Sequence, residues 1–119
     1  HESFCKNLVD YFRQAALDEN ALIPQAKLTQ YLLVKLTKND KSGYLAQAGY
    51  TIDNWKQLEE KLRQQLSLPA TLDHETNFGT IYKIEGVLKG ANGINLNIAT
   101  FWIIDRETKE TKFVTLLPN

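Results

Sequence analysis

The sequence contains no methionine, one cysteine and three prolines among its 119 residues. The single cysteine, Cys5, excludes an internal disulfide, and no cysteine-based zinc site is available. No apolar run reaches the length of a membrane-spanning helix. Fourteen basic residues balance fourteen acidic ones, so the net charge argues neither for nor against a nucleic-acid partner. Because the chain begins with His1 and lacks methionine, we expect a fragment of a longer protein.

Motifs of the common enzyme classes are also missing. The sequence has no P-loop, no GxGxxG, no GxSxG and no HExxH. Its two histidines are His1 and His74, and the second stands in the polar run Asp73-His74-Glu75. Adjacent ligands in one loop, without partners elsewhere, make a weak metal site, and a solvated loop is the favoured interpretation. We therefore expect neither a metal nor another cofactor.

Strand patterns are concentrated in residues 78–117, which predict a three-stranded antiparallel meander. The run over 78–88 is rich in β-branched and aromatic residues, and the segment KGANG after it can supply the positive φ angles of a hairpin. The run over 94–104 alternates with period 2, which is typical of a strand. One face of that strand carries Ile94, Leu96, Ile98, Thr100, Trp102 and Ile104. The charged segment DRETKE then predicts a turn into the third strand, TKFVTLL.

Helical patterns account for most of the chain before this sheet. Apolar residues recur at helical spacing over 2–17, and shorter helices are predicted over 24–33, 41–48 and 51–66. Residues 34–40 and 70–77 are predicted as a lysine-bearing loop and a polar connection. We expect one α+β domain over 1–119, divided into an N-terminal helix (1–21), a helical part (22–77) and a sheet (78–117). About four helices should cover one face of the sheet, because three bare strands are marginally stable.

Lysines provide the first candidate binding site. Lys35, Lys38 and Lys41 fall within seven residues, at the entry to the predicted third helix. Together with lysines on the sheet, such as Lys83, they could line a groove that binds phosphate. A lysine ammonium can stabilise the negative charge of a phosphoryl-transfer transition state. The alternative is a solvated surface, which the spacing alone favours.

A hydroxyl on an apolar strand face is the second candidate. Thr100 interrupts the apolar face of its strand, and a buried hydroxyl without a hydrogen bond costs about 1–3 kcal/mol. Thr115 can lie near it if the hairpin register allows. Threonine is a good strand former, so a structural role is as well supported as a functional one. Trp102, on the same face, is more readily a core anchor than a platform for a base.

Three segments together resemble an uncharacterised bacterial domain family: IPQAKLTQYLL (23–33), DKSGYLAQAGYTIDNWKQLEEKL (40–62) and FGTIYKIEGVLKGANGINLNIATFWIIDRETKETKFVTLLP (78–118). The likeness covers residues 22–117 and contains no catalytic signature. Members of that family occur alone and at the C-terminus of polymorphic and contact-dependent growth-inhibition toxins. A helical N-terminal part followed by a small antiparallel sheet is similar to the barnase–EndoU–colicin–RelE group of ribonuclease toxins. Those toxins cleave RNA, often tRNA, without a metal.

The resemblance implies particular site residues. The family's helix lysine falls on Lys41, its strand threonine on Thr100, its tryptophan on Trp102 and its terminal threonine on Thr115. The closing motif of the family has an arginine, which here is either replaced by Lys112 or absent. The loop before Lys41 is also shorter than in the family and lacks its His-Pro and basic cluster. Any catalytic group that those elements supply is therefore altered here.

The function implied by the resemblance is that of a C-terminal toxin domain, delivered within a larger secreted effector and active in the cytoplasm of the target cell. We expect a metal-independent ribonuclease whose substrate is tRNA. Lys41 would stabilise the phosphorane charge, Thr100 or Thr115 would orient the phosphate, and His74 would assist proton transfer. The residues expected to bind substrate are Lys35, Lys38, Lys83, Trp102 and Lys112. A cognate immunity protein is the expected partner, and dependence on a host co-factor protein stays open.

The alternative function is a non-enzymatic protein-binding module, either an immunity- or antitoxin-like protein or a standalone domain. Such a module would use the sheet edge or the open sheet face for contact. The neutral charge and the lack of an evident acid–base pair favour this alternative. The resemblance and the unusual start of the chain favour the toxin.

Overall fold

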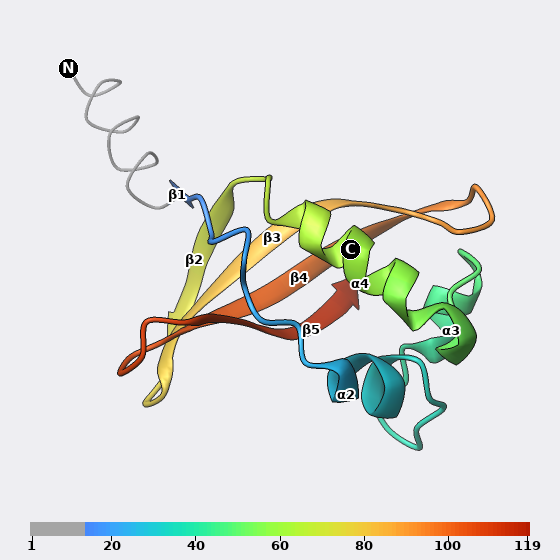
Figure 1. The fold of residues 1–119 in the computed structure, drawn as a ribbon, viewed down its shortest axis with the longest axis horizontal. Coiled ribbons are helices and arrows are strands. Elements are labelled where there is room, and N and C mark those ends of the chain that lie inside the picture. Colours follow the sequence, from blue (N-terminus) through green and yellow to red (C-terminus); the bar gives the residue numbers. More distant parts are fainter. Residues whose placement is uncertain (1–13) are drawn as a thin grey trace.

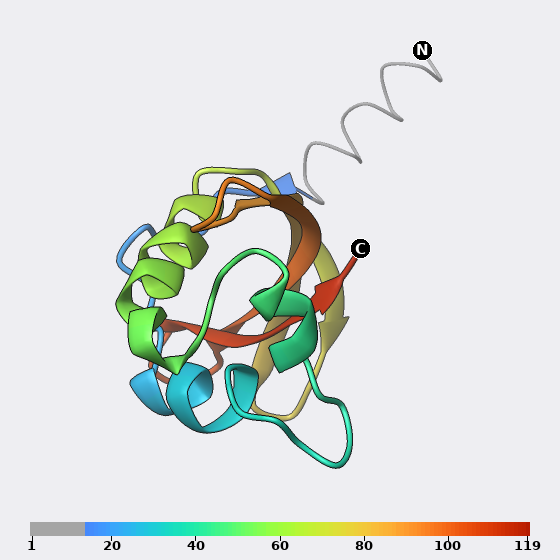
Figure 2. The same cartoon turned by 90° about the vertical axis from the view of Figure 1, so that its right-hand side faces the viewer.

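The fold is α+β, with the helices on one side of a curved antiparallel sheet (Figures 1 and 2). The computed structural model describes residues 14–119. The helical segments are α2 (Gln25–Lys27), the π-helical turn η1 (Leu28–Leu32), α3 (Ser42–Ala46), the 3₁₀ turn η2 (Ile52–Asn54) and α4 (Trp55–Gln65). The strands are β1 (Gln14–Ala15), β2 (Ala70–Glu75), β3 (Gly79–Lys89), β4 (Asn95–Asp105) and β5 (Thr111–Pro118). Their spatial order is the order of the sequence, β1-β2-β3-β4-β5.

The strand prediction is right for the two hairpins and wrong for the number of strands. The predicted meander is present as β3, β4 and β5. The predicted polar connection over 70–77 contains β2, which pairs antiparallel with β3. Only Ala70 of β2 is buried, so hydrogen bonding to β3 holds this strand and its sequence carries no apolar alternation. Residues 14–15, at the end of the predicted first helix, form β1, and residues 2–13 of that helix lie outside the described part.

The other helix predictions fall on real helical segments that are mostly shorter than expected. α2 and η1 occupy the predicted second helix, α3 the third, and η2 with α4 the fourth. Gly49 follows α3 with φ at 82°, a left-handed conformation that favours glycine. Thr51 and Asn54 form the reciprocal cap of the fourth helix, since the Thr51 N–H donates to Asn54 Oδ1 at 2.8 Å. Among residues 14–119, no helix is long and apolar enough to cross a membrane.

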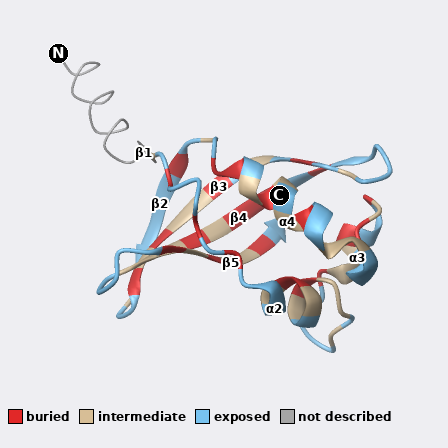
Figure 3. Ribbon diagram, viewed as in Figure 1, coloured by how far each residue is buried: buried red, intermediate tan, exposed pale blue. Residues whose placement is uncertain are grey.

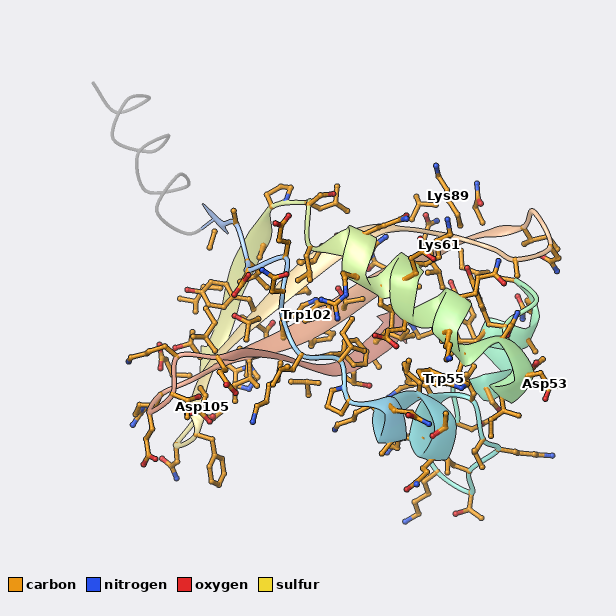
Figure 4. The ribbon with its side chains drawn as sticks, viewed as in Figure 1. Asp53, Trp55, Lys61, Lys89, Trp102 and Asp105 are labelled. Atoms are coloured by element: carbon orange, nitrogen blue, oxygen red, sulfur yellow. The ribbon has the colours of Figure 1, made fainter. Side chains whose placement is uncertain are left out.

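The core lies between α4 and the inner face of the sheet (Figure 3). Trp102 of β4 is fully buried there and packs edge-on against Phe113 of β5, with ring centroids 5.2 Å apart (Figure 4). The helices contribute Leu28, Leu32, Leu45, Leu58, Leu62 and Leu66. Burying a leucine side chain stabilises the fold by about 1.5–3 kcal/mol, so these contacts hold the helices on the sheet.

The end of helix α4 lies against β3 at Gly86. A Cβ atom added to this glycine would lie 2.3 Å from Gln65 Oε1 and 2.6 Å from Leu68 Cδ1. The same Gln65 side chain donates from Nε2 to the Val87 carbonyl at 2.9 Å, so it cannot move away without losing that bond. Gly86 therefore sets the distance between helix and sheet.

We predict that Gly86→Ala destabilises the protein by about 1–3 kcal/mol, the usual cost of overpacking. The matched control is Gly43→Ala in α3, because nothing lies within 4 Å of the Cβ added there. Alanine has the higher helix propensity, so Gly43→Ala should be neutral or stabilising by up to about 1 kcal/mol. Urea unfolding of both variants measures the difference. An unchanged unfolding midpoint for Gly86→Ala would contradict the close packing of α4 on β3.

Candidate functional site

The sheet separates the predicted site residues into two groups. We call the face of β2–β5 turned away from the helices the outer face. In one register row of this face Lys83 pairs with Phe101, and Phe101 pairs with Thr115. In the next row of the outer face, His74, Ile81, Ile103 and Lys112 are paired from strand to strand. His74, Lys83, Lys112 and Thr115 therefore lie on the outer face.

Thr100 and Trp102 lie on the opposite, inner face, and both side chains are fully buried. Trp102 Nε1 donates to Thr100 Oγ1 at 2.8 Å, and the Thr100 hydroxyl donates to the Ile84 carbonyl at 3.5 Å. These bonds satisfy the threonine and the indole inside the core. A substrate cannot reach either residue in this structure. The expected roles of Thr100 in catalysis and of Trp102 in substrate binding are thus replaced by structural roles.

Lys41 is the buried cation of the site, with an exposed fraction of 8%. Its Nζ donates to Thr115 Oγ1 at 2.9 Å and to the Tyr31 hydroxyl at 3.3 Å, and it lies 4.9 Å from the centroid of the Tyr31 ring. Among residues 14–119, no carboxylate forms an ion pair with this ammonium. Hydroxyls and a ring face compensate a buried charge only in part. The arrangement can therefore accept an anion.

The loop over 34–40 positions Lys41 at the edge of β5. Asp40 Oδ1 accepts hydrogen bonds from the Leu36 N–H at 3.2 Å and from the Ser42 hydroxyl at 2.7 Å, which closes the loop. These bonds, the Ser42 hydroxyl first, lower the pKa of Asp40 below its ordinary value. Lys35 and Lys38 lie exposed on the same loop, next to Lys41 in sequence but outside its hydrogen-bonded cluster.

A hollow on the outer face lies beside this cluster and has a volume of ≈ 260 Å³. Thr115, which contacts Lys41, forms part of its wall, and Phe101 and Ile81 contribute apolar surface. The other lining residues are Asp73, His74, Val114 and Leu117. Thr115 is the one residue that belongs to both, and Lys41 itself contacts Thr115 without lining the hollow.

Both irregularities in the strand pairing occur at this hollow. The register of β2 against β3 shifts between Leu72 and His74, and the register of β5 against β4 shifts at Val114. Such bulges change the direction of neighbouring side chains and are common next to active sites. At the first bulge Asp73 and His74 line the same hollow, and Asp73 Oδ2 is hydrogen-bonded to His74 Nδ1. The expected solvated loop around His74 is therefore an exposed strand with an oriented imidazole.

The two remaining lysines of the outer face have acidic neighbours. Lys83 Nζ lies 3.2 Å from Glu85 Oε1. Lys112 lies near Asp105, whose pKa is lowered first by the backbone N–H groups of Thr108 and Glu107 and further by the charge of Lys112. Both lysines are thus partly neutralised, in contrast to Lys41. Among residues 14–119, no three His, Cys, Asp or Glu side chains gather closely enough to hold a metal ion.

Sequence reasoning did not assign three residues of this site: Tyr31, Asp73 and Phe101. Tyr31 lies in the helical segment η1, and its hydroxyl accepts a hydrogen bond from Lys41 Nζ at 3.3 Å. A signal for Phe101 was nevertheless present, because Phe101 and Ile103 are apolar on the strand face that also carries two asparagines. Apolar residues on both faces of one strand indicate that the second face has something to contact.

We predict that Thr100→Val destabilises the protein by about 1–3 kcal/mol, because Trp102 Nε1 then loses its acceptor inside the core. Thr100→Ser keeps the hydroxyl and is the control, with a smaller loss. Chemical denaturation followed by tryptophan fluorescence measures both variants. Equal stability of Thr100→Val and the unchanged protein would exclude the structural role.

Asp40 generates a prediction about pH. Because its pKa is lower in the folded state than in the unfolded chain, its stabilising contribution is complete above the unfolded pKa of about 3.9. The contribution is lost as the pH falls through the lower folded pKa. Asp40→Asn should therefore be less stable than the unchanged protein at neutral pH, and the difference should shrink at acidic pH.

Urea unfolding over a pH series tests this, with Glu60→Gln as the control for a carboxylate on α4 that makes no side-chain hydrogen bond within residues 14–119. The control should follow the unchanged protein. A stability difference for Asp40→Asn that grows toward acidic pH would show that Asp40 does not hold the loop in its charged form.

Comparison with known proteins adds the family to this description. No curated protein and no solved structure matches the chain significantly. One protein family matches residues 15–119, which include all described elements after β1 and every residue of the site. The chain therefore belongs to the family described as "Domain of unknown function (DUF6883)".

Proposed function

We propose that this protein is a metal-independent ribonuclease of the bacterial toxin class. The observation that carries the proposal is Lys41, a buried ammonium that contacts two hydroxyls and a ring face and no carboxylate among the described residues. The free energy cost of burying such a charge is reduced when an anion binds to it. An RNA phosphate is an anion that fits this position, because the adjoining hollow offers apolar surface for the attached nucleoside.

In the proposed reaction, the 2′-hydroxyl of a ribose attacks the adjacent phosphorus. A bond from O2′ to phosphorus forms, and the bond from phosphorus to O5′ breaks. Lys41 and the Thr115 hydroxyl contact the non-bridging oxygens, where negative charge increases in the transition state. Preorganised donors of this kind contribute about 10²–10³ in rate each.

Proton transfer in this reaction is assigned to His74. Its Nδ1 is bonded to Asp73, which leaves Nε2 as the atom that can take the proton of the 2′-hydroxyl. The same imidazolium can then protonate the leaving O5′. His74 on β2 and Thr115 on β5 both line the hollow, so the proposal places the scissile phosphate in the hollow between them, over β3 and β4. Lys83 and Lys112 lie on the same outer face and would contact neighbouring phosphates.

The biological setting of the proposal comes from the sequence resemblance. The order of short helices followed by an antiparallel sheet is compatible with the barnase–EndoU–colicin–RelE group, and we propose membership of that group. The domain would be delivered by a larger secreted effector, cleave tRNA in the target-cell cytoplasm and be neutralised by a cognate immunity protein. An immunity protein that covers the outer face would place an acidic side chain against Lys41.

The test is induced expression in bacteria, with total RNA separated on a denaturing gel. The unchanged domain should arrest growth and produce discrete tRNA fragments. Lys41→Met keeps an unbranched apolar stem and removes the charge, so it should lower the cleavage rate about 10²–10³-fold while the protein stays folded. Lys56→Ala, an exposed lysine on α4, is the matched control and should remain toxic.

Circular dichroism and thermal unfolding of the purified variants separate loss of the site from loss of the fold. If Lys41→Met is folded and cleaves RNA at the unchanged rate, the proposed site is wrong. If the unchanged domain is folded, harmless and leaves cellular RNA intact, the ribonuclease proposal fails and the protein-binding module takes its place.

A further inference from the structure

The hollow on the outer face has properties that the phosphate site alone does not require. Phe101 is half-buried there, although it does not belong to the core cluster, and it lies on the interior strand β4. Ile81 is 7% exposed on the same face, although the helices cover the opposite one. An aromatic ring at the middle of an uncovered sheet face is a surface that accepts a flat apolar group.

The position of the ring relative to Lys41 identifies that group. Phe101 and Thr115 are direct register partners, and side chains so paired lie about 5 Å apart at Cβ. Lys41 Nζ is 2.9 Å from Thr115 Oγ1. A ligand that touches both therefore needs a flat apolar part within a few ångströms of an anionic part. A nucleotide has this chemistry.

The lysines on either side of the Phe101 ring indicate the direction in which a bound polynucleotide would run. Lys83, whose Nζ lies 3.2 Å from Glu85 Oε1, pairs with Phe101 from β3, and Lys41 reaches Thr115 at β5, so a lysine stands on each side of the ring in one register row. The two strands concerned are about 10 Å apart, two strand spacings. A polynucleotide that crosses the strands can hold a phosphate at each side and a base between them.

We infer that Phe101 forms a base-binding subsite that takes an unpaired nucleobase next to the phosphate held by Lys41. This inference rests on the proposed ribonuclease function and defines its substrate class further. A base inside a duplex is stacked and paired on both sides, so its face cannot lie on Phe101. The substrate is therefore RNA with an unpaired nucleotide at the cleavage point, as in a loop, and a continuous duplex is excluded.

Binding is tested with a strand that cannot be cleaved: single-stranded 2′-O-methyl RNA containing 2-aminopurine, whose fluorescence falls when it stacks. The unchanged protein should quench this fluorescence. Phe101→Leu keeps an apolar side chain and removes the ring, so the quenching should be lost and the Kd should rise roughly 5- to 150-fold, the effect of one stacked base. Phe101→Trp should retain the quenching.

The matched control is Phe78→Leu, which removes a ring that is 77% exposed in the turn between β2 and β3 and does not line the hollow. It should bind the strand like the unchanged protein. In a cleavage assay, a hairpin RNA should be cut in its loop and a blunt duplex of the same sequence should stay intact. Phe101→Leu should lower kcat/KM for the hairpin.

Different results would contradict the base-binding subsite and the ribonuclease proposal. Quenching that is equal in Phe101→Leu and the unchanged protein, or cleavage of the duplex at the rate of the loop, overturns the base-binding subsite and leaves the ribonuclease proposal standing. Binding of the methylated strand through Phe101, together with no cleavage of any RNA, overturns the proposed catalysis and keeps the subsite.

Discussion

The hydrogen bond between Trp102 and Thr100 is the constraint on which the rest of the structure depends. It buries two polar groups in the middle of the inner face of β4 and leaves neither without a partner. Because side chains alternate along a strand, fixing these two residues inward also turns Phe101 outward. A slip of one residue would exchange the two faces and bury the candidate site in the core. The inward facing of Thr100 and Trp102 thus accompanies the outward facing of Phe101.

The two bulges then give this outer face its chemistry. A regular strand would direct Asp73 and His74 to opposite faces, and the bulge in β2 allows both to line one hollow. The bulge at Val114 shifts the register of β5 so that Thr115, and with it Lys41, lies beside Phe101. An ideal sheet with the same sequence would separate these groups. Irregular pairing at two separate strands around one hollow is an argument for a function there.

The sequence predicted those strands and helices best whose apolar residues recur with the period of a single type of secondary structure. Period-2 alternation identified β4, and apolar residues at helical spacing identified the fourth helix, present as η2 and α4. The strand β2 had no such signal, because five of its six residues are exposed. Lys41 was a candidate from the lysine spacing and Thr115 from the expected strand register, and the resemblance named both again, but only the fold shows that these residues, 74 positions apart, are hydrogen-bonded. The partner of Thr100 could have been foreseen, since Trp102 follows two residues later on the same face.

The net charge of the chain also gave no indication of the site, because the site depends on how single residues are arranged in the fold. Fourteen basic and fourteen acidic residues cancel in the total, but the site depends on which cations lack an acidic neighbour. Lys83 is paired with Glu85, whereas Lys41 is surrounded by hydroxyls and a ring. A buried ammonium that is not paired with a carboxylate lowers the stability of the fold. Binding of an anionic ligand offsets this loss, which gives a reason for such a residue to be kept. The charge of Lys41, which forms no ion pair within residues 14–119, therefore indicates function more directly than the composition does, because it is a property of one position.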